Sequence, residues 1–457
     1  MIIFAYILSF LMGWAVLNLF NPPWPLSLRL PLALGLGLGI SGVLTFLCLL
    51  TYGQYQPFLI ISTNLTVLAG LLIWTARCRK WNFFGIKRHW PTIPGVLVIG
   101  GGLFAITFFM GQKHPFGEWD AWALWNMKSK FLVFGQDHWK AIFNELHWHT
   151  QPDYPLLLPL IHTWQFCWSD QQSLLPIPRL TAAAFATLTP LLLYGGLRAF
   201  VPRLPSLTAA LLLTIFPFYM FLATAQYADI LLGFYLLASL IGVISLLRKV
   251  SSSTALATAL SMGLMSFTKN EGIVLTLLLT TLLSGALLWR RRNILRRPRQ
   301  WPESLRPLGV FWMALAVSLL PTIFFKLVLT PPNRDILIPS GGTSWPFWNT
   351  RGLRLIAGAA RYEFFQQRWC WMWFFLTFLL IINPLKFIQR ERKVVTAFFL
   401  GYGFILLYVY LTTIHFDLAW RLKSTLHRIL FYLLPSWLFF AFYAHWADSP
   451  AKEAPDD

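Results

Sequence analysis

Acidic side chains capable of acid–base chemistry stand in two short polar segments of an otherwise strongly apolar chain. The first contains Glu118-Trp-Asp120, and the second places Asp153 in the run His-Thr-Gln-Pro-Asp-Tyr-Pro. Two carboxylates that meet in one cleft can orient or deprotonate a hydroxyl group. Asp120, Asp153 and Glu118 are therefore candidate catalytic residues. Candidate substrate-binding residues in the same segments are Lys128, His149 and Tyr154.

Asp120 also has a simpler structural explanation. It begins a helical pattern in which Trp122, Trp125 and Lys128 recur about one turn apart, as expected for an amphipathic helix on a membrane surface. A carboxylate at a helix start accepts hydrogen bonds from free N–H groups and is favoured by the helix dipole. Capping alone would account for Asp120, so both interpretations stay open.

Three further ionisable residues lie at the ends of apolar stretches. Asp229 follows Gln-Tyr-Ala and directly precedes an apolar run, and Lys269-Asn-Glu271 forms a hairpin between two such runs. An ionisable residue that enters a membrane span is costly and usually functional, whereas one at the boundary is often only interfacial. A surface ion pair between Lys269 and Glu271 would stabilise little. We treat Asp229, Lys269 and Glu271 as candidate substrate-binding residues, with these structural alternatives open.

Several arginines in the C-terminal half of the sequence could bind an anion. Arg351, Arg354 and Arg361 share nearly one helical face, because spacings of three and seven return to the same side. Arg421 and Arg428 lead into the last apolar stretch. A guanidinium group suits a phosphate or an anionic lipid. Arg361, Arg421 and Arg428 are candidate phosphate contacts, and simple binding of lipid headgroups by the 351–361 helix is the alternative.

The composition shows what must position these residues. Of 457 residues, 57% are hydrophobic, 17% are aromatic and only 12% are charged. This excludes an ordinary soluble enzyme and a disordered chain. The 4 cysteines exclude a disulfide scaffold and show no metal-ligand spacing. The net charge of +20 predicts basic cytoplasmic loops rather than a nucleic-acid partner.

The apolar stretches predict an all-α polytopic membrane protein with about 13 transmembrane helices and juxtamembrane helices on the outer face. The first stretch is expected to be a retained span, not a signal peptide, and 155–168 is too short and should lie on the surface or re-enter. The predicted spans are 2–20, 30–52, 57–76, 93–112, 174–197, 205–225, 229–247, 254–269, 272–289, 309–329, 370–385, 395–413 and 429–446.

The basic stretches set the expected orientation. Arg77–Arg88, Arg290–Arg306 and Lys386–Lys393 can all face the cytoplasm if 155–168 does not cross the membrane. The N-terminus is then outside and the C-terminus inside. Two long outer loops, 113–173 and 330–369, hold most of the candidate residues. A site facing away from the cytoplasm is therefore expected.

This arrangement resembles the polytopic GT-C glycosyltransferases that use a polyprenyl-phosphate sugar, especially the protein O-mannosyltransferase and lipid A aminoarabinose transferase branch. Glu118-Trp-Asp120 looks like the acidic motif of the first large outer loop, and Pro152-Asp153-Tyr-Pro looks like the second motif. Tyr227-Ala-Asp229 resembles a later acidic motif, and Arg421–Arg428 resembles the basic stretch before a late span. The resemblance implies a catalytic module at 93–446, preceded by three N-terminal spans at 1–92 and followed by a polar cytoplasmic tail at 447–457.

The resemblance also implies a function. A sugar would move from a polyprenyl-phosphate donor to a lipid, glycan or protein acceptor on the periplasmic side of a bacterial-type inner membrane, with inversion. Asp120 would act as the base or orienting residue. Arg361, Arg421, Arg428 and Lys128 would offset the charge of the lipid-phosphate leaving group. No ligand spacing in the sequence demands a cofactor, although a divalent cation between the carboxylates and the phosphate is compatible with the chemistry. The alternative is a transporter or flippase of a lipid-linked or anionic solute, which would place polar residues near the bilayer midplane.

Overall fold

Helices form 85% of the computed structural model, and no β-strand occurs in the residues that it describes. These residues are 1–78, 93–169, 175–290, 301–332, 349–412 and 417–447. The all-α expectation is confirmed for them. Much of the expected outer loop 330–369, most of two basic stretches and the tail from 448 onward lie outside the described residues.

The N-terminal half contains long apolar helices and a group of short ones between α5 and α8. In chain order the helices are α1 (Ile3–Phe20), α2 (Leu26–Tyr52), α3 (Pro57–Cys78), α5 (Ile93–Gly111), η2 (Ala121–Trp125), α6 (Asn126–Phe134), η3 (Gln136–Phe143), η4 (Glu145–Thr150), α7 (Leu157–Phe166), α8 (Pro176–Arg198), α9 (Arg203–Thr214) and α10 (Pro217–Thr224).

The C-terminal half also contains long helices and a second group of short ones. Its helices are α11 (Ala228–Arg248), α12 (Ser252–Ser266), α13 (Asn270–Arg290), α15 (Trp301–Phe324), η6 (Phe325–Leu329), α16 (Thr350–Phe365), η8 (Gln367–Trp369), α17 (Met372–Ile382), η9 (Pro384–Ile388), α18 (Arg392–Thr412) and α19 (Leu418–Trp446). The elements η2 and η6 are single π-helical stretches, and the other η elements are 3₁₀ helices.

Among the described residues, nine helices are long and apolar enough to cross a membrane, or ten if a bent pair counts as one span. They comprise α1, α2, α3, α8, α11, α13, the segment Arg306–Leu329, α18 and α19. All nine coincide with predicted spans. The chain therefore has the architecture of a multi-pass membrane protein.

The four remaining predicted spans coincide with less regular elements. They are α5, the pair α9 and α10, which is bent by 63°, α12 and α17. The 15 residues of α12 and the 11 of α17 fall short of the roughly 20 that a straight span needs. The total of about 13 spans thus stays a prediction.

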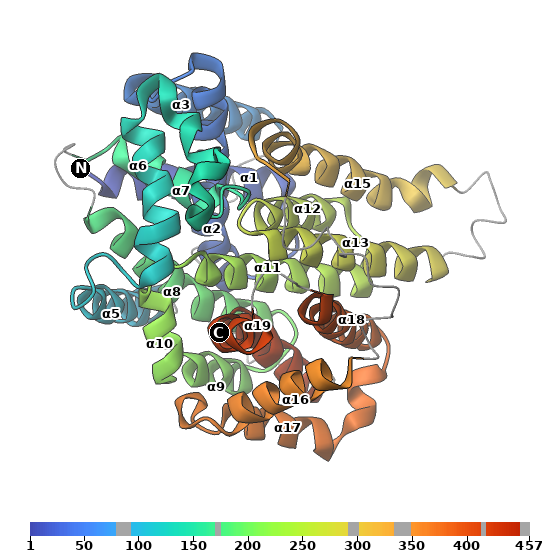
Figure 1. Ribbon diagram of the computed structural model, residues 1–457. Coiled ribbons are helices and arrows are strands. Elements are labelled where there is room, and N and C mark those ends of the chain that lie inside the picture. The colour runs from blue at the N-terminus through green and yellow to red at the C-terminus, as the bar shows by residue number, and fades with distance from the viewer. Residues whose placement is uncertain (79–92, 170–174, 291–300, 333–348, 413–416, 448–457) are drawn as a thin grey trace.

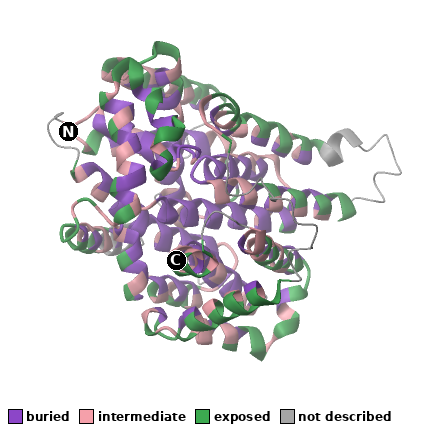
Figure 2. Ribbon diagram, in the orientation of Figure 1, coloured by how far each residue is buried: buried purple, intermediate pink, exposed green. Residues whose placement is uncertain are grey.

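The helix α11 lies in the middle of the molecule and is buried along almost its whole length (Figures 1 and 2). It packs against α8, α12, α13 and α19. Asp229 lies in the first turn of this central helix, where Lys269 and Arg428 contact its carboxylate. The fold therefore gives one buried carboxylate partners from distant parts of the chain.

The predicted N-terminal region, 1–92, packs directly on the remaining helices through α2. Small residues allow this close approach. A Cβ atom on Gly35 would lie 2.2 Å from the Phe234 ring, and one on Gly37 would lie 1.6 Å from the Ser9 carbonyl oxygen. The glycines of α2 thus allow close packing against neighbouring helices.

The short helix α7 is enclosed by its neighbours. All ten of its residues are buried, against α2, α6 and α8. The segment is therefore packed inside the protein rather than exposed on its surface.

Candidate functional site

Five charged side chains from five places in the chain form one connected network. They come from the residue before η2, the first turn of α11, the turn between α12 and α13, the first turn of α13, and the N-terminal half of α19. We call them the charge network, and its members are Asp120, Asp229, Lys269, Glu271 and Arg428. All five are predicted site residues, and the fold brings them together.

Arg428 is the centre of this network. Its Nη1 donates a hydrogen bond to Asp120 Oδ2 at 2.5 Å. Its Nε and Nη2 both donate to Asp229 Oδ2, at 3.1 and 2.7 Å. Charge-assisted bonds of this kind are about twice as strong as neutral ones. One guanidinium group therefore holds two carboxylates in fixed positions.

Asp120 does not cap the helix that follows it. It stands at the N-cap position of η2, yet its side chain accepts no capping hydrogen bond. The carboxylate points instead to Arg428, so capping does not account for Asp120. The expected surface helix is also only partly exposed, since Trp125 and Lys128 are fully buried while Trp122 is 44% exposed.

Tyr227 lies against the centre of the network, and the sequence analysis assigned it no role. The Arg428 guanidinium carbon is 4.4 Å from the centroid of the Tyr227 ring. Such a cation–π contact is favourable when the cation is desolvated. Burial and the nearby Asp120 carboxylate raise the pKa of the Tyr227 hydroxyl, so the group stays protonated.

Lys269 extends the network from Asp229 to Glu271. Its Nζ lies 3.0 Å from Asp229 Oδ1 and 3.1 Å from Glu271 Oε1. Burial disfavours the ammonium form, but the two carboxylates outweigh this effect and raise the pKa of Lys269. The lysine is therefore charged at neutral pH. The network then holds three negative and two positive groups.

The two ends of the network are more accessible than its middle. The side chains of Asp120 and Glu271 are 22% and 25% exposed, whereas that of Asp229 is 2% exposed. Glu271 Oε2 is buried and has no hydrogen-bond partner among the described residues. A molecule that binds here would therefore meet Asp120 and Glu271 first, while Asp229 acts as a buried counter-ion.

Asp153 joins the same region through a second set of contacts. Asn270, the residue after Lys269, donates from Nδ2 to Asp153 Oδ2 at 2.7 Å. Lys326 donates from Nζ to the same oxygen at 3.2 Å and to the Asp153 carbonyl oxygen at 2.6 Å. The expected proximity of the first two acidic segments to Asp229 is thus present in the fold.

The sequence analysis missed Asn270 and Lys326. Lys326 had a usable signal, because it is a lone cation near the end of the predicted span 309–329. Intramembrane cations are rare and usually have a buried partner. Asn270 gave no such signal, since an amide in a polar hairpin has many ordinary uses.

Lys128 was predicted to bind substrate, but it lies in the interior of the protein. Its side chain is fully buried, and its Nζ donates to the carbonyl oxygens of Gln151 at 2.6 Å and Tyr154 at 3.1 Å. Burial lowers the pKa of Lys128 to about 7, although the Asp153 carboxylate acts in the opposite direction. This lysine cannot reach a substrate in this arrangement. It fixes the turn that carries Asp153.

Tyr154 lies between two buried cations. The Lys128 and Lys269 ammonium nitrogens are 5.9 and 5.8 Å from the centroid of its ring. These distances fit cation–π contacts on one aromatic ring. Tyr154 therefore links the 151–154 turn to the charge network rather than standing free as a substrate contact.

Two residues position the loop that carries Asp120. Gln226 donates from Nε2 to the carbonyl oxygens of His114 and Pro115, both at 3.3 Å, and accepts from Asn126 at 3.2 Å. Gly117 has a φ of 71°, and a Cβ atom there would lie 2.6 Å from the Ala225 carbonyl oxygen. Only glycine adopts this conformation so close to another backbone without strain. The loop is thereby tied to the segment just before Asp229.

Two other predicted residues lie outside the charge network. Glu118 pairs with His114 at 3.6 Å, and its backbone N–H donates to the Ala225 carbonyl oxygen. His149 is exposed, and its ring centroid lies 6.0 Å from that of Trp148. In the described part of the chain, neither side chain is hydrogen-bonded or ion-paired to Asp120 or Asp229, so their predicted roles receive no geometric support.

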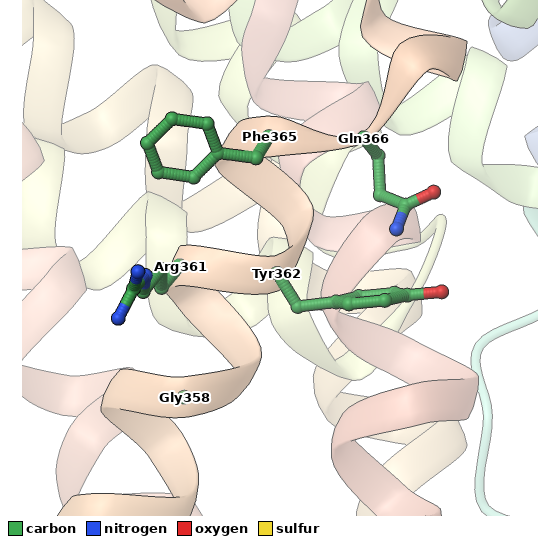
Figure 3. A pocket seen from close by; sticks show the side chains of 5 residues that line it. All are labelled: Gly358, Arg361, Tyr362, Phe365 and Gln366. Atoms are coloured by element: carbon green, nitrogen blue, oxygen red, sulfur yellow. The ribbon is translucent and has the colours of Figure 1, made fainter.

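The two remaining arginines differ in their surroundings. Arg421 is half-buried, and its Nη1 has no hydrogen-bond partner among the described residues. Arg361 is exposed on α16, beside a hollow of about 400 Å³ lined by Gly358, Arg361, Tyr362, Phe365 and Gln366 (Figure 3).

No group of three or more His, Cys, Asp or Glu side chains is arranged to hold a metal ion in the described ranges. The carboxylates of the site are instead paired with arginine and lysine. The comparisons add no relative to this geometry. No protein-family model, curated protein or solved structure matches the chain.

Proposed function

We propose that this chain is a membrane glycosyltransferase that moves a sugar from a polyprenyl-phosphate donor to an acceptor, in the manner of the GT-C enzymes. One observation carries the proposal. The partly exposed Asp120 carboxylate is held by Arg428 at the accessible end of a buried charge network. A carboxylate fixed in this way is suited to orienting a nucleophile, because its own position costs nothing further to organise at the moment of reaction.

The proposed reaction is one in-line displacement. The acceptor hydroxyl or amine binds at Asp120 and attacks C1 of the sugar, which forms the new bond to C1. The bond between C1 and the phosphate oxygen breaks, and its electron pair leaves with the polyprenyl phosphate. Asp120 accepts the proton of the nucleophile. The attack comes from the face opposite the leaving group, so the anomeric centre inverts.

The leaving phosphate needs positive charge nearby. Arg421 is the best candidate, because its Nη1 donor is unused by the described residues. Arg428 is committed to Asp120 and Asp229, and Lys128 is committed to backbone carbonyls. We therefore assign Arg428 and Lys128 to holding the site together and Arg421 to the phosphate.

The remaining parts of the proposal concern the membrane. The lipid of the donor would lie between spans, with the sugar at the helix ends that carry Asp120 and Glu271. The protein would sit in a bacterial-type inner membrane with this end on the periplasmic side and about 13 spans. The acceptor would be a lipid, a glycan or a protein. The apolar helices that surround the site support burial of a lipid-linked substrate and exclusion of water.

The test uses the full-length protein in lipid nanodiscs. It receives a panel of polyprenyl-phosphate sugars with a radiolabel on the sugar, and membranes from cells that lack the protein supply acceptors. We expect the label to leave the donor lipid and appear in a lipid, glycan or protein fraction, with one polyprenyl phosphate released per sugar. Heat-denatured protein is the control. A label that stays on every donor would contradict the proposal.

The same materials distinguish transport. In sealed vesicles a transporter would move an intact labelled donor between leaflets without cleaving it. A transferase would release polyprenyl phosphate on the face that carries Asp120. Movement of the donor without cleavage would replace the proposed function with transport.

A further inference from the structure

The helix α16 presents a face of arginines and large apolar side chains to its surroundings. Arg351, Arg354 and Arg361 are all exposed. Tyr362 and Phe365 are 63% and 62% exposed. At 100° per residue, these five side chains and Leu355 fall within a sector of about 120°. We call this sector the arginine face.

Contacts on the opposite side hold α16 in place. The Asn349 side chain caps the helix by accepting a hydrogen bond from the Gly352 N–H at 2.9 Å. Gly352 itself is buried, and a Cβ atom there would lie 2.9 Å from a methyl group of Leu411 on α18. The arginine face is therefore directed away from the helix bundle by packing of the other side.

The C-terminal end of α16 is locked as well. Glu363 is 4% exposed, and its carboxylate accepts hydrogen bonds from Trp369 Nε1, at 2.9 Å, and from Arg368. Trp369 is fully buried and packs against Phe218 of α10, with ring centroids 4.9 Å apart. The only acidic residue of α16 is thus used internally. The three exposed arginines have no acidic partner among the described residues.

A shallow hollow interrupts the arginine face near its end. Gly358 forms its floor, since a Cβ atom at this position would meet nothing within 4 Å. Figure 3 shows Arg361 and Phe365 on one side of the helix and Tyr362 and Gln366 on the other. The hollow holds about 400 Å³ and combines one cation with two aromatic rings. A small anionic group with an apolar extension matches this combination.

The segment that follows α16 in the sequence places this face at a membrane boundary. Trp371 is 75% exposed, and the apolar helix α17 begins at the next residue and exposes Phe378 and Ile381. Tryptophan and tyrosine at the end of an apolar helix are typical of the headgroup level of a bilayer. Arginines there attract anionic lipids. The charge of the face and its continuity with α17 together select a lipid as the occupant.

We propose that the arginine face of α16 binds the phosphate headgroups of anionic membrane phospholipids. Arg354 and Arg361 bind the phosphate, and Leu355, Tyr362 and Phe365 contact the upper part of the acyl chains. This binding does not depend on glycosyl transfer.

The test measures lipid binding by the full-length protein in neutral detergent. Short-chain fluorescent phosphatidylglycerol and phosphatidylcholine are titrated against the wild type and two double variants. The first variant is Arg354→Gln with Arg361→Gln. The second is Lys130→Gln with Lys140→Gln, which removes the same charge from exposed lysines in the 113–173 segment. Circular dichroism and size-exclusion chromatography confirm that each variant is folded.

We expect the wild type and the lysine variant to bind phosphatidylglycerol in preference to phosphatidylcholine. The arginine variant should bind phosphatidylglycerol about 30-fold more weakly. Equal binding of both lipids by the wild type would overturn the proposal, and so would unchanged binding by the arginine variant. The proposal would also be overturned if millimolar inorganic phosphate displaced the lipid. It would be overturned as well if polyprenyl phosphate were the only lipid that displaced it. None of these readings requires transferase activity, so this proposal and the proposed function fail separately.

Discussion

The carboxylate of Asp120 accepts a hydrogen bond from Nη1 of Arg428, although 308 residues separate the two in the sequence. The same guanidinium binds Asp229, which is 199 residues away from Arg428. The guanidinium group of Arg428, on the last helix, therefore joins a loop in the first third of the chain to the central helix α11. This contact is the structural basis of the proposed site.

Replacing Arg428 by Met should strongly destabilise the protein. The change leaves Asp229 buried with only Lys269 as its partner, and breaking a buried ion pair costs about 3–5 kcal/mol. The measurement is the thermal midpoint in detergent. Arg421→Met, in the same helix, is the control and should lower the midpoint much less. Equal midpoints for the two variants would show that Arg428 does not organise the site.

The pair Asp153 and Lys326 should be energetically coupled. Lys326 donates to both the carboxylate and the backbone carbonyl of Asp153, so the carboxylate part of the contact can be separated by a double-mutant cycle. We expect Asp153→Asn and Lys326→Met to show a coupling of about 1 kcal/mol in the free energy of unfolding. Strictly additive effects would mean that the two side chains do not interact.

Lys128 should make the stability depend on pH in a predictable direction. Its pKa in the folded protein is lowered to about 7 by burial, below the ordinary value of 10.5. Between these values the unfolded state binds the proton more tightly, so the stability contribution of Lys128 rises with pH. The increase should be up to about 1 kcal/mol per pH unit.

The variant Lys128→Met isolates this effect. The unfolding free energy of the wild type, relative to that of the variant, should increase from pH 7 to pH 9. Lys130→Met, two residues away and exposed, should follow the wild-type profile. A parallel profile for Lys128→Met would mean that the buried lysine does not titrate in this range.

Gly117→Ala should detach the loop that carries Asp120. The new methyl group would lie 2.6 Å from the Ala225 carbonyl oxygen, and the φ of 71° is strained for alanine. We expect a loss of about 1–2 kcal/mol or more in stability. Gly102→Ala is the matched control, because nothing lies within 4 Å of a Cβ atom there. If Gly102→Ala were as unstable as Gly117→Ala, the loss of stability could not be attributed to the backbone conformation and close contact at Gly117.

Much of this arrangement follows from local sequence patterns. Long apolar runs mark the spans because a helix in lipid must satisfy its own backbone. All nine candidate spans were predicted in this way. The acids Asp120, Asp153 and Asp229 also stand out, because carboxylates are rare in so apolar a chain. Their expected meeting in one region is present in the fold.

Partner choice could not be predicted from the same patterns. Nothing in the sequence pairs Arg428 with Asp120 rather than with a ligand. That contact depends on how α19 packs against α11 and on the hydrogen bonds that tie the Asp120 loop to the segment before α11. Lys128 looks like an exposed basic residue on an amphipathic helix. It can be buried because the backbone carbonyls of Gln151 and Tyr154, which a list of side chains does not show, accept hydrogen bonds from its ammonium group.

The central claim is that Asp120 acts on the nucleophile in sugar transfer. The decisive measurement is the rate of polyprenyl-phosphate release by Asp120→Asn in nanodiscs, compared with Asp137→Asn. Asp137 is an exposed acid in the same 113–173 segment, with a side chain that is 74% exposed. The account predicts that Asp120→Asn slows transfer by about 100-fold or more while Asp137→Asn keeps the wild-type rate. A folded Asp120→Asn protein that transfers sugar at the rate of Asp137→Asn would contradict it.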